Sequence, residues 1–123
     1  MPHFGVTSRQ KLGGAHPDLV RVAEALIEHR DLIIIETIRD DERQKLLFAQ
    51  GRSHLDGITR RSKHQTSAEQ PLSIAIDLAP FYADEYPKIP WAIAPVTDPK
   101  KLENLRRWYV FCGQVIATGW ERV

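Results

Sequence analysis

The stretch that decides the fold runs from residue 62 to residue 80 and reads Ser-Lys-His-Gln-Thr-Ser-Ala-Glu-Gln-Pro-Leu-Ser-Ile-Ala-Ile-Asp-Leu-Ala-Pro. It begins as a polar segment that carries His64 and ends as an apolar run with a single acid, Asp77. The alternation of side chains along a strand predicts two different faces over residues 73–79. The bulky face, suited to a core, consists of Ile74, Ile76 and Leu78. On the other face Asp77 lies between two alanines, which leave space around its carboxylate.

A carboxylate inside an apolar strand is unfavourable unless another group pairs with it. Two interpretations of Asp77 stay open at this point. In the first, the acid pairs with an arginine or caps a neighbouring backbone. In the second, Asp77 and His64 are ligands of one metal ion. Zinc accepts imidazole nitrogen and carboxylate oxygen, and a catalytic zinc keeps three protein ligands and a water.

The same residues resemble a known signature. Residues 62–64 (Ser-Lys-His) and 73–77 (Ser-Ile-Ala-Ile-Asp) resemble the Ser-x-His-x-x-Gly-x-Ala-x-Asp signature of the VanY-like zinc peptidases. That family includes D-alanyl-D-alanine carboxypeptidases and phage L-alanyl-D-glutamate endopeptidases, and the continuation Leu-Ala-Pro-Phe-Tyr is more similar to the phage branch. Ser73 stands where the signature has Gly, and six extra residues around 67–72 separate the His from the Asp. Such an insertion adds little to the free energy of loop closure if its ends stay in place.

The resemblance implies an α+β fold of the hedgehog/D-Ala-D-Ala peptidase type and a zinc ion held by His64 and Asp77. It implies a zinc-dependent endopeptidase that acts on the peptidoglycan stem peptide of the cell wall, as phage endolysins do. Arg39, in a Thr-x-Arg pattern, would hold anionic charge of the substrate or transition state. Gln44 and Ser62 would assist substrate binding, Gln44 by positioning. Without the resemblance, Arg39 would be interpreted as a surface residue at a strand end.

The rest of the chain predicts about three helices packed on a small, mainly antiparallel sheet. Strands are expected at residues 32–38 and 73–79, and helices at residues 17–30, 40–50 and 98–118. Pro17 and Pro99 suit first helical positions, and Asp40 suits an N-cap. We expect an extended arm at residues 1–15, a loop in the proline-rich residues 81–95, and the start of a further strand at residues 120–123.

Length and composition allow one domain, residues 1–123, with its own core. The net charge of +1 favours no nucleic-acid partner. The single cysteine, Cys112, excludes an internal disulfide and a Cys-rich zinc site, and its apolar neighbours predict a buried thiol. The first residues contain no signal-peptide pattern, and no apolar run is long enough to span a membrane. These features predict synthesis in the cytoplasm, with a wall target reached only after release.

Residues 51–63 form a polar and locally basic connection that carries several arginines and His54. Three interpretations stay open: a solvated loop, a cleft edge that attracts an anionic substrate, or a nucleic-acid groove. The segment lacks the interleaved aromatic residues on which bases stack, which argues against the third. His54 is a possible metal neighbour outside the matched signature.

The resemblance also implies features that this sequence does not contain. In the family, a third zinc ligand is a His near the C-terminus, preceded by a catalytic acid, whereas this sequence has no His after His64. The expectation is therefore a peptidase-like domain that is incomplete at its C-terminus, with an incomplete zinc site, weak or no activity, and an unpaired strand edge through which copies could associate. A truncated chain, a ligand supplied by a partner, and a non-catalytic descendant that binds wall peptide or a protein are the alternatives.

Overall fold

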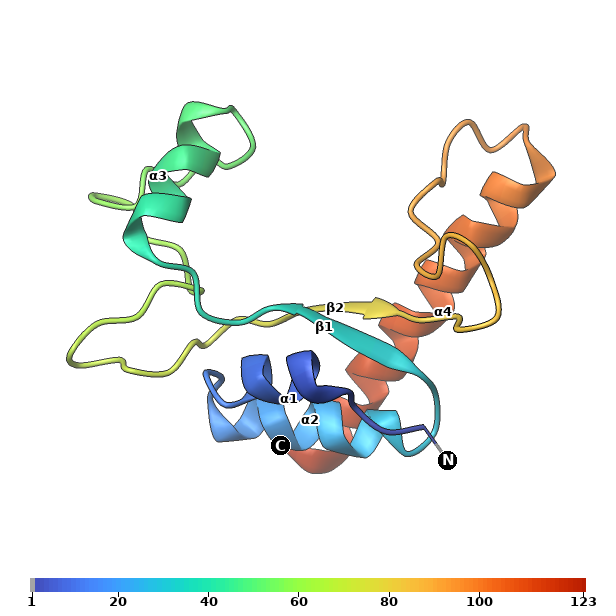
Figure 1. Ribbon diagram of the computed structural model, residues 1–123, viewed down its shortest axis with the longest axis horizontal. Helices are drawn as coiled ribbons and strands as arrows, with labels where there is room; N and C mark the ends of the chain where they lie inside the picture. Colours follow the sequence, from blue (N-terminus) through green and yellow to red (C-terminus); the bar gives the residue numbers. More distant parts are fainter. Residues whose placement is uncertain (1) are drawn as a thin grey trace.

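Two short strands pair antiparallel at the centre of the molecule, and helices pack around them (Figure 1). The structure, a computed structural model, describes residues 2–123. In this range the strands are β1 (Leu32–Glu36) and β2 (Asp77–Pro80). The four helices are α1 (Val6–Leu12), α2 (Pro17–Ile27), α3 (Asp41–Ala49) and α4 (Pro99–Arg122). The prediction of an α+β fold with a small antiparallel sheet is confirmed, with four helices in place of about three.

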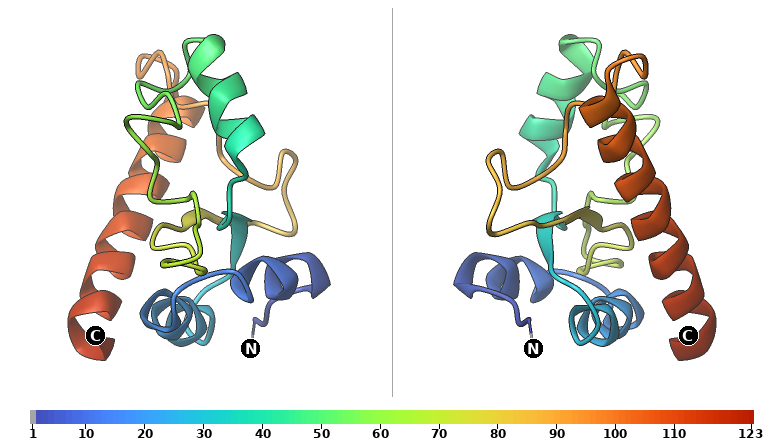
Figure 2. Two further views of the ribbon diagram at one scale, coloured as in Figure 1. Left: turned by 90° about the vertical axis from the view of Figure 1, so that its left-hand side faces the viewer. Right: turned by 90° about the vertical axis from the view of Figure 1, so that its right-hand side faces the viewer.

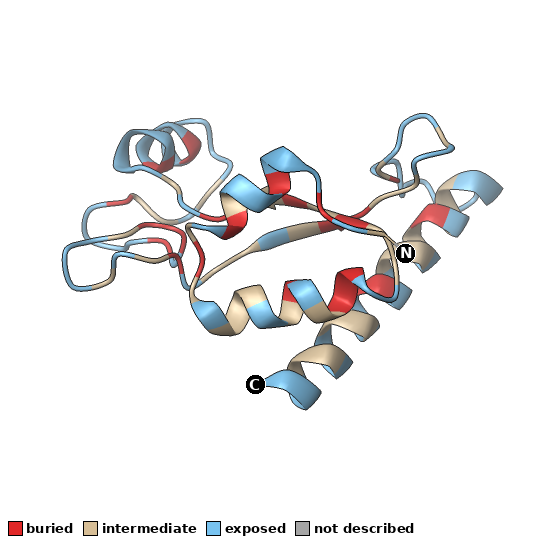
Figure 3. Ribbon diagram, turned by 60° about the horizontal axis from the view of Figure 1, so that its bottom comes forward, coloured by how far each residue is buried: buried red, intermediate tan, exposed pale blue. Residues whose placement is uncertain are grey.

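The core lies on one side of the sheet, where α1, α2 and the C-terminal part of α4 pack (Figures 1 and 2). Ala23, Leu26 and Ile27 of α2 are buried at helical spacing, as the amphipathic pattern predicts. Ile34 of β1 and Phe111 of α4 join the same cluster. Figure 3 shows buried residues along β1 and on the facing sides of α1 and α2, whereas the outer parts of the molecule are mostly exposed.

Two arms extend from the other side of the sheet (Figures 1 and 2). One arm consists of α3 and the connection that follows it. The other arm consists of the N-terminal part of α4 together with residues 81–98, which precede α4 in the sequence. Asp40 caps α3 by accepting from the Arg43 N–H at 2.7 Å, and Asp98 caps α4 by accepting from the Lys100 N–H at 2.9 Å. The expected loop at residues 81–95 is confirmed.

A β-bulge interrupts the pairing of the two strands at Ile35. Ile34 pairs with Leu78, and the next pair is Glu36 with Asp77, so Ile35 is the extra residue of β1. Strict alternation would have placed Glu36 on the same face as the buried Ile34. The bulge instead places Glu36 opposite Asp77, on the side of the sheet away from the core.

The N-terminal residues do not form the predicted extended arm, because residues 6–12 are helical. Ser8 and Leu12 are buried and lie four residues apart, on one side of α1, and Phe4 just before the helix is buried as well. Ser8 Oγ accepts a hydrogen bond from the Ile34 N–H at 3.2 Å, which fixes α1 on β1. Burial of this face against the strand stabilises a short helix that glycines flank on both sides.

The predicted strand at residues 73–79 is shorter and begins only at Asp77. Ser73 Oγ accepts from the Ala75 N–H at 3.2 Å and donates to the Ala75 carbonyl at 2.6 Å, which turns the chain before the strand. Ile74 is therefore exposed, while Ile76 and Leu78 pack against the core as expected. The first strand also ends earlier than predicted, at Glu36.

The predicted strand at residues 120–123 is wrong, since α4 continues through Gly119 to Arg122. The expectation of an unpaired sheet edge through which copies could associate is separate from this strand and stays a prediction, because the two-stranded sheet of the described residues 2–123 has an outer edge on each strand. The prediction of a buried Cys112 is also wrong, because the thiol lies on an exposed part of α4. The adjacent Phe111 is the residue that faces the core, and neighbouring helical residues point about 100° apart. Among residues 2–123, no helix is long and apolar enough to cross a membrane.

Candidate active site

The side of the sheet away from the core carries a cluster of two acids and a histidine. Ligand atoms of Glu36, His64 and Asp77 all lie within 4.8 Å of one another. Glu36 and Asp77 meet because the bulge places them opposite each other across the two strands. His64 comes from the long connection between α3 and β2, and its side chain is buried. The sequence therefore brings together three potential metal donors from three separate segments.

His64 is held by the backbone that follows β1. Its Nδ1 lies 2.7 Å from the Thr37 carbonyl oxygen, and its own carbonyl accepts from the Arg39 N–H at 2.8 Å. The His64 N–H in turn donates to Ser62 Oγ at 3.2 Å. A carbonyl oxygen can only accept, so Nδ1 carries the proton and Nε2 keeps its lone pair in the neutral ring.

Nε2 of His64 faces the carboxylate of Asp77, with 3.3 Å between Nε2 and Oδ1. Two lone pairs at this distance repel each other unless a cation lies between them, and that cation is either a proton or a metal ion. Zinc bonds of about 2.0–2.1 Å at a tetrahedral angle place two ligand atoms about 3.3–3.4 Å apart. The separation of Nε2 and Oδ1 therefore matches both possibilities, as the hypothesis of a shared metal requires.

The same contact shifts the pKa of both partners when a proton is the cation. The hydrogen bond that the protonated imidazole donates to Asp77 raises the pKa of His64, while partial burial opposes the shift. The hydrogen bond from His64 lowers the pKa of the Asp77 carboxyl, again against partial burial. The pair thus stabilises positive charge between the two side chains.

Arg39 lies beside this pair, where it is only 13% exposed. Its Nε donates to Glu36, and one terminal nitrogen donates to Gln44 Oε1 at 2.9 Å and to Ser62 Oγ at 3.4 Å. The other terminal nitrogen lies 3.9 Å from Asp77 Oδ2 and has no hydrogen bond within residues 2–123. A guanidinium has five N–H groups, so donors remain on the side that faces Asp77.

Gln44 and Ser62, both predicted to assist substrate binding, are buried and contact Arg39. Gln44 has no exposed surface, and its amide donates to Ser53 Oγ at 3.0 Å and to the Leu55 carbonyl at 2.6 Å. With both donors used, its Oε1 is fixed toward Arg39. Gly57 makes room for this side chain, because a Cβ at position 57 would lie 2.9 Å from Gln44 Cγ.

Glu36 is the residue of the cluster that the sequence interpretation missed. Its carboxylate accepts from Nε of Arg39 and, at 3.2 Å, from Nε of Arg43. Carboxylates that bind metals are commonly hydrogen-bonded in this way, so the two arginines do not exclude a third donor role. The available signal was an acid within the predicted strand at residues 32–38, comparable to the acid within an apolar run that singled out Asp77.

The insertion between His64 and Asp77 is closed at its base, which explains why these two residues still meet. The Ile74 N–H donates to the Lys63 carbonyl at 3.2 Å. Ser73 also pairs with the segment before α2, since its N–H donates to the Gly14 carbonyl at 2.8 Å and its carbonyl accepts from the His16 N–H at 2.8 Å. The extra residues form a loop that projects away from the sheet (Figure 1). Its ends stay in place, as a tolerated insertion requires.

The donor set fits zinc. Imidazole nitrogen and carboxylate oxygen are ordinary zinc ligands, and the cluster offers three groups, the number a catalytic zinc takes from protein. The thiol of Cys112 lies on α4, outside the cluster. His54 is exposed and is not a member of this group of donors among residues 2–123.

A family model for phage L-alanyl-D-glutamate peptidases matches residues 2–100. The chain belongs to this family. The members of this family are classed as peptidoglycan endopeptidases, which are hydrolases, and the resemblance inferred from residues 62–77 is confirmed.

A solved structure supports the same assignment of this phage peptidase family member. The chain resembles the crystal structure of the Serratia marcescens L-Ala D-Glu endopeptidase ChiX, with a TM-score of 0.55 and 26% sequence identity. The similarity covers 89% of this chain and 73% of the ChiX chain. No curated protein sequence matches the chain.

Gln44, which contacts Arg39, packs against Gly57, and this packing leads to a testable prediction. Gly57→Ala is expected to destabilise the protein by about 1–3 kcal/mol more than Gly51→Ala, because only the first substitution adds overpacking to backbone strain. Both glycines have positive φ, +85° for Gly57 and +70° for Gly51, but nothing lies within 4 Å of a Cβ at position 51. Urea denaturation, monitored by circular dichroism, measures the loss in free energy of unfolding for both variants. Equal losses would show that Gln44 does not pack tightly against Gly57.

Proposed function

We propose that this protein is a zinc-dependent endopeptidase that hydrolyses the L-alanyl–D-glutamate bond of peptidoglycan stem peptides. The observation that carries the proposal is the approach of His64 Nε2 to Asp77 Oδ1 at 3.3 Å, in a chain of the phage L-alanyl-D-glutamate peptidase family. The target would be the bacterial cell wall. A non-catalytic descendant that binds wall peptide is the competing function.

His64 and Asp77 would hold the metal, and Glu36 is placed to be the third donor. A bound zinc would polarise the scissile carbonyl and lower the pKa of a water molecule so that hydroxide is available near neutral pH. The chain's own residues prepare the site for this ion. The Thr37 carbonyl fixes the tautomer of His64, and the arginines beside Glu36 orient its carboxylate.

Arg39 would bind negative charge of the substrate. In a stem peptide the D-glutamate carries a free carboxyl group close to the bond that joins it to L-alanine. The free N–H groups of Arg39 face the Asp77 side of the site, where they can pair with that carboxylate or with the oxyanion that forms during hydrolysis. Gln44 and Ser62 would act through Arg39, because both contact its guanidinium and both are buried.

Hydrolysis of purified peptidoglycan tests the proposal directly. We expect the protein with one equivalent of zinc to release new L-alanine carboxyl ends and new D-glutamate amino ends, detected by mass spectrometry. A chelator should abolish the release, and added zinc should restore it. His64→Ala and Asp77→Asn should reduce both zinc affinity and hydrolysis to background.

His54→Ala is the matched control, since it removes an exposed histidine that lies outside the cluster, and it should hydrolyse peptidoglycan as the unmodified protein does. Binding to peptidoglycan without any new ends would support the non-catalytic alternative. Cleavage that survives both the chelator and His64→Ala would contradict the metal-dependent reaction.

The role of Arg39 is tested by comparing two arginines that share the partner Glu36. Arg39→Ala is expected to lower kcat about a hundredfold, the typical loss when one preorganised donor to developing charge is removed. Arg43→Ala removes the same charge from the other oxygen of Glu36 but does not approach Asp77, so its kcat should fall less than about threefold. Steady-state kinetics on a synthetic stem peptide measure both. Equal losses of kcat in the two variants would show that the loss comes from the disturbed Glu36 carboxylate and not from a direct role of the Arg39 guanidinium.

A further inference from the structure

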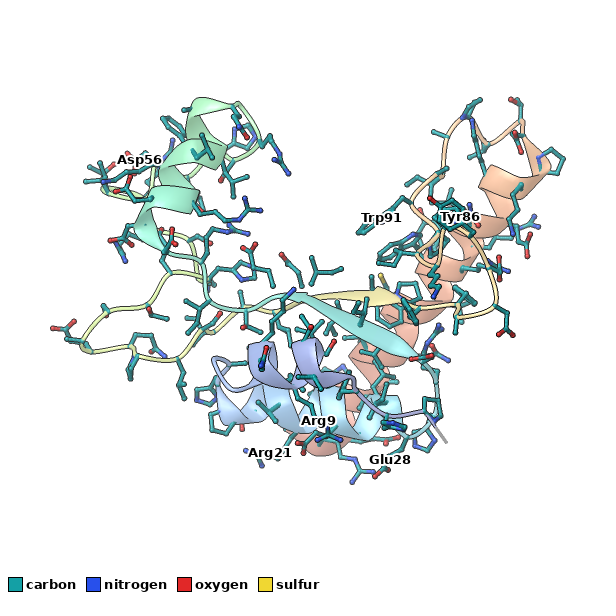
Figure 4. The ribbon with its side chains drawn as sticks, viewed as in Figure 1. Arg9, Arg21, Glu28, Asp56, Tyr86 and Trp91 are labelled. Carbon is teal, nitrogen blue, oxygen red and sulfur yellow. The ribbon has the colours of Figure 1, made fainter. Side chains whose placement is uncertain are left out.

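Trp91 lies in the arm that stands opposite α3, in the loop between β2 and α4. The residue is 57% exposed although tryptophan is among the largest apolar side chains. Figure 4 shows its side chain extending from this loop toward the space between the two arms, with Tyr86 lying farther toward α4. Trp91 therefore borders the same open side of the molecule as the bulge that carries Glu36 and Asp77.

The backbone on both sides of Trp91 is tied to α4. Trp108 Nε1 donates to the Pro90 carbonyl at 2.8 Å, and Asn104 Nδ2 donates to the Ala92 carbonyl at 2.9 Å. The indole of Trp91 also packs against the indole of Trp108, with ring centroids 5.6 Å apart and an angle of 34° between the planes. Trp91 is thus held in place on one side, while more than half of its surface remains open to a ligand.

A rigid, half-exposed aromatic side chain is suited to binding. Because its position is already fixed, little conformational entropy is lost when a ligand covers it. One cluster of charges in the arm is internally paired, since Glu85 accepts from Arg107 at 3.0 Å and lies 3.3 Å from the Lys100 ammonium. The exposed indole of Trp91 itself is suited to a ligand with an apolar face.

The substrate of the proposed reaction contains such a group next to the scissile bond. The L-alanine of a stem peptide is joined through its amino group to the lactyl ether of N-acetylmuramic acid, so a sugar ring lies one residue from the bond to D-glutamate. The C–H groups on one face of a pyranose ring are attracted to the negative face of an indole. Two residues of extended chain span roughly 7 Å, so a sugar at this position stays near the site.

We propose that Trp91 is a stacking platform for the N-acetylated sugar on the amino side of the scissile bond. The inference rests on the proposed function, because it takes its ligand from the substrate of that reaction. It assigns the two arms different tasks: the α3 side presents Arg39 to the peptide carboxylate, and the α4 side presents Trp91 to the glycan. The protein would accordingly prefer stem peptides that are still attached to sugar.

The test compares two substrates that differ only in the sugar. One is a disaccharide stem peptide, and the other is the same peptide with an N-acetyl group in place of the sugar. Trp91→Ala should raise KM for the disaccharide substrate about fivefold, in the range expected for one lost aromatic contact, and should leave KM for the acetylated peptide within about twofold. Tyr86→Ala, which removes a 97% exposed aromatic residue from the same loop, should change neither.

A second measurement separates failure of this inference from failure of the proposed function. Binding of the free disaccharide of N-acetylglucosamine and N-acetylmuramic acid, titrated by nuclear magnetic resonance, requires no hydrolysis. Disaccharide binding that Trp91→Ala weakens supports the platform even if no substrate is cleaved. Equal effects of Trp91→Ala on both substrates, or disaccharide binding that Trp91→Ala leaves unchanged, would overturn it.

Discussion

The contact between His64 Nε2 and Asp77 Oδ1 is the constraint on which the site depends. The Thr37 carbonyl forces the proton of the neutral imidazole onto Nδ1, so the lone pair of Nε2 faces a carboxylate oxygen at 3.3 Å. A cation between the two atoms, either a proton or a metal ion, relieves the repulsion between their lone pairs. In the absence of metal a proton plays this role, which accounts for the raised pKa of His64 and the lowered pKa of Asp77. A zinc ion plays it with the same spacing.

Much of the surrounding structure serves to maintain this contact. The bulge at Ile35 brings Glu36 across from Asp77, and the bond between Ile74 and Lys63 closes the inserted loop so that its length does not separate the donors. Arg39 is positioned by a buried chain of contacts that runs through Gln44 to Gly57. These features come from distant parts of the sequence, and each acts by fixing an orientation. The site is therefore preorganised, which is the condition for strong electrostatic stabilisation of developing charge.

The sequence was informative where a residue contradicted its local pattern. An acid within an apolar strand pointed to Asp77, and a Ser-x-His pattern before it pointed to His64; both lie in the cluster. Glu36 was missed because strict alternation assigns it to the core face, and a bulge depends on the pairing of two strands and not on either one alone. The helix at residues 6–12 was missed because its stability comes from burying Phe4, Ser8 and Leu12 on β1, a tertiary effect. Gly119 did not end α4, because a glycine in a helix costs only about 1 kcal/mol and other contacts can offset that.

The most direct test of the central claim is a crystal structure of the protein grown with zinc, with diffraction data recorded on both sides of the zinc absorption edge. The account predicts one strong anomalous peak between His64 Nε2 and Asp77 Oδ1, about 2 Å from each atom, with Glu36 adjacent. The two side chains should keep the orientations described here. An anomalous peak located elsewhere, or no peak between His64 Nε2 and Asp77 Oδ1 at saturating zinc, would contradict the account.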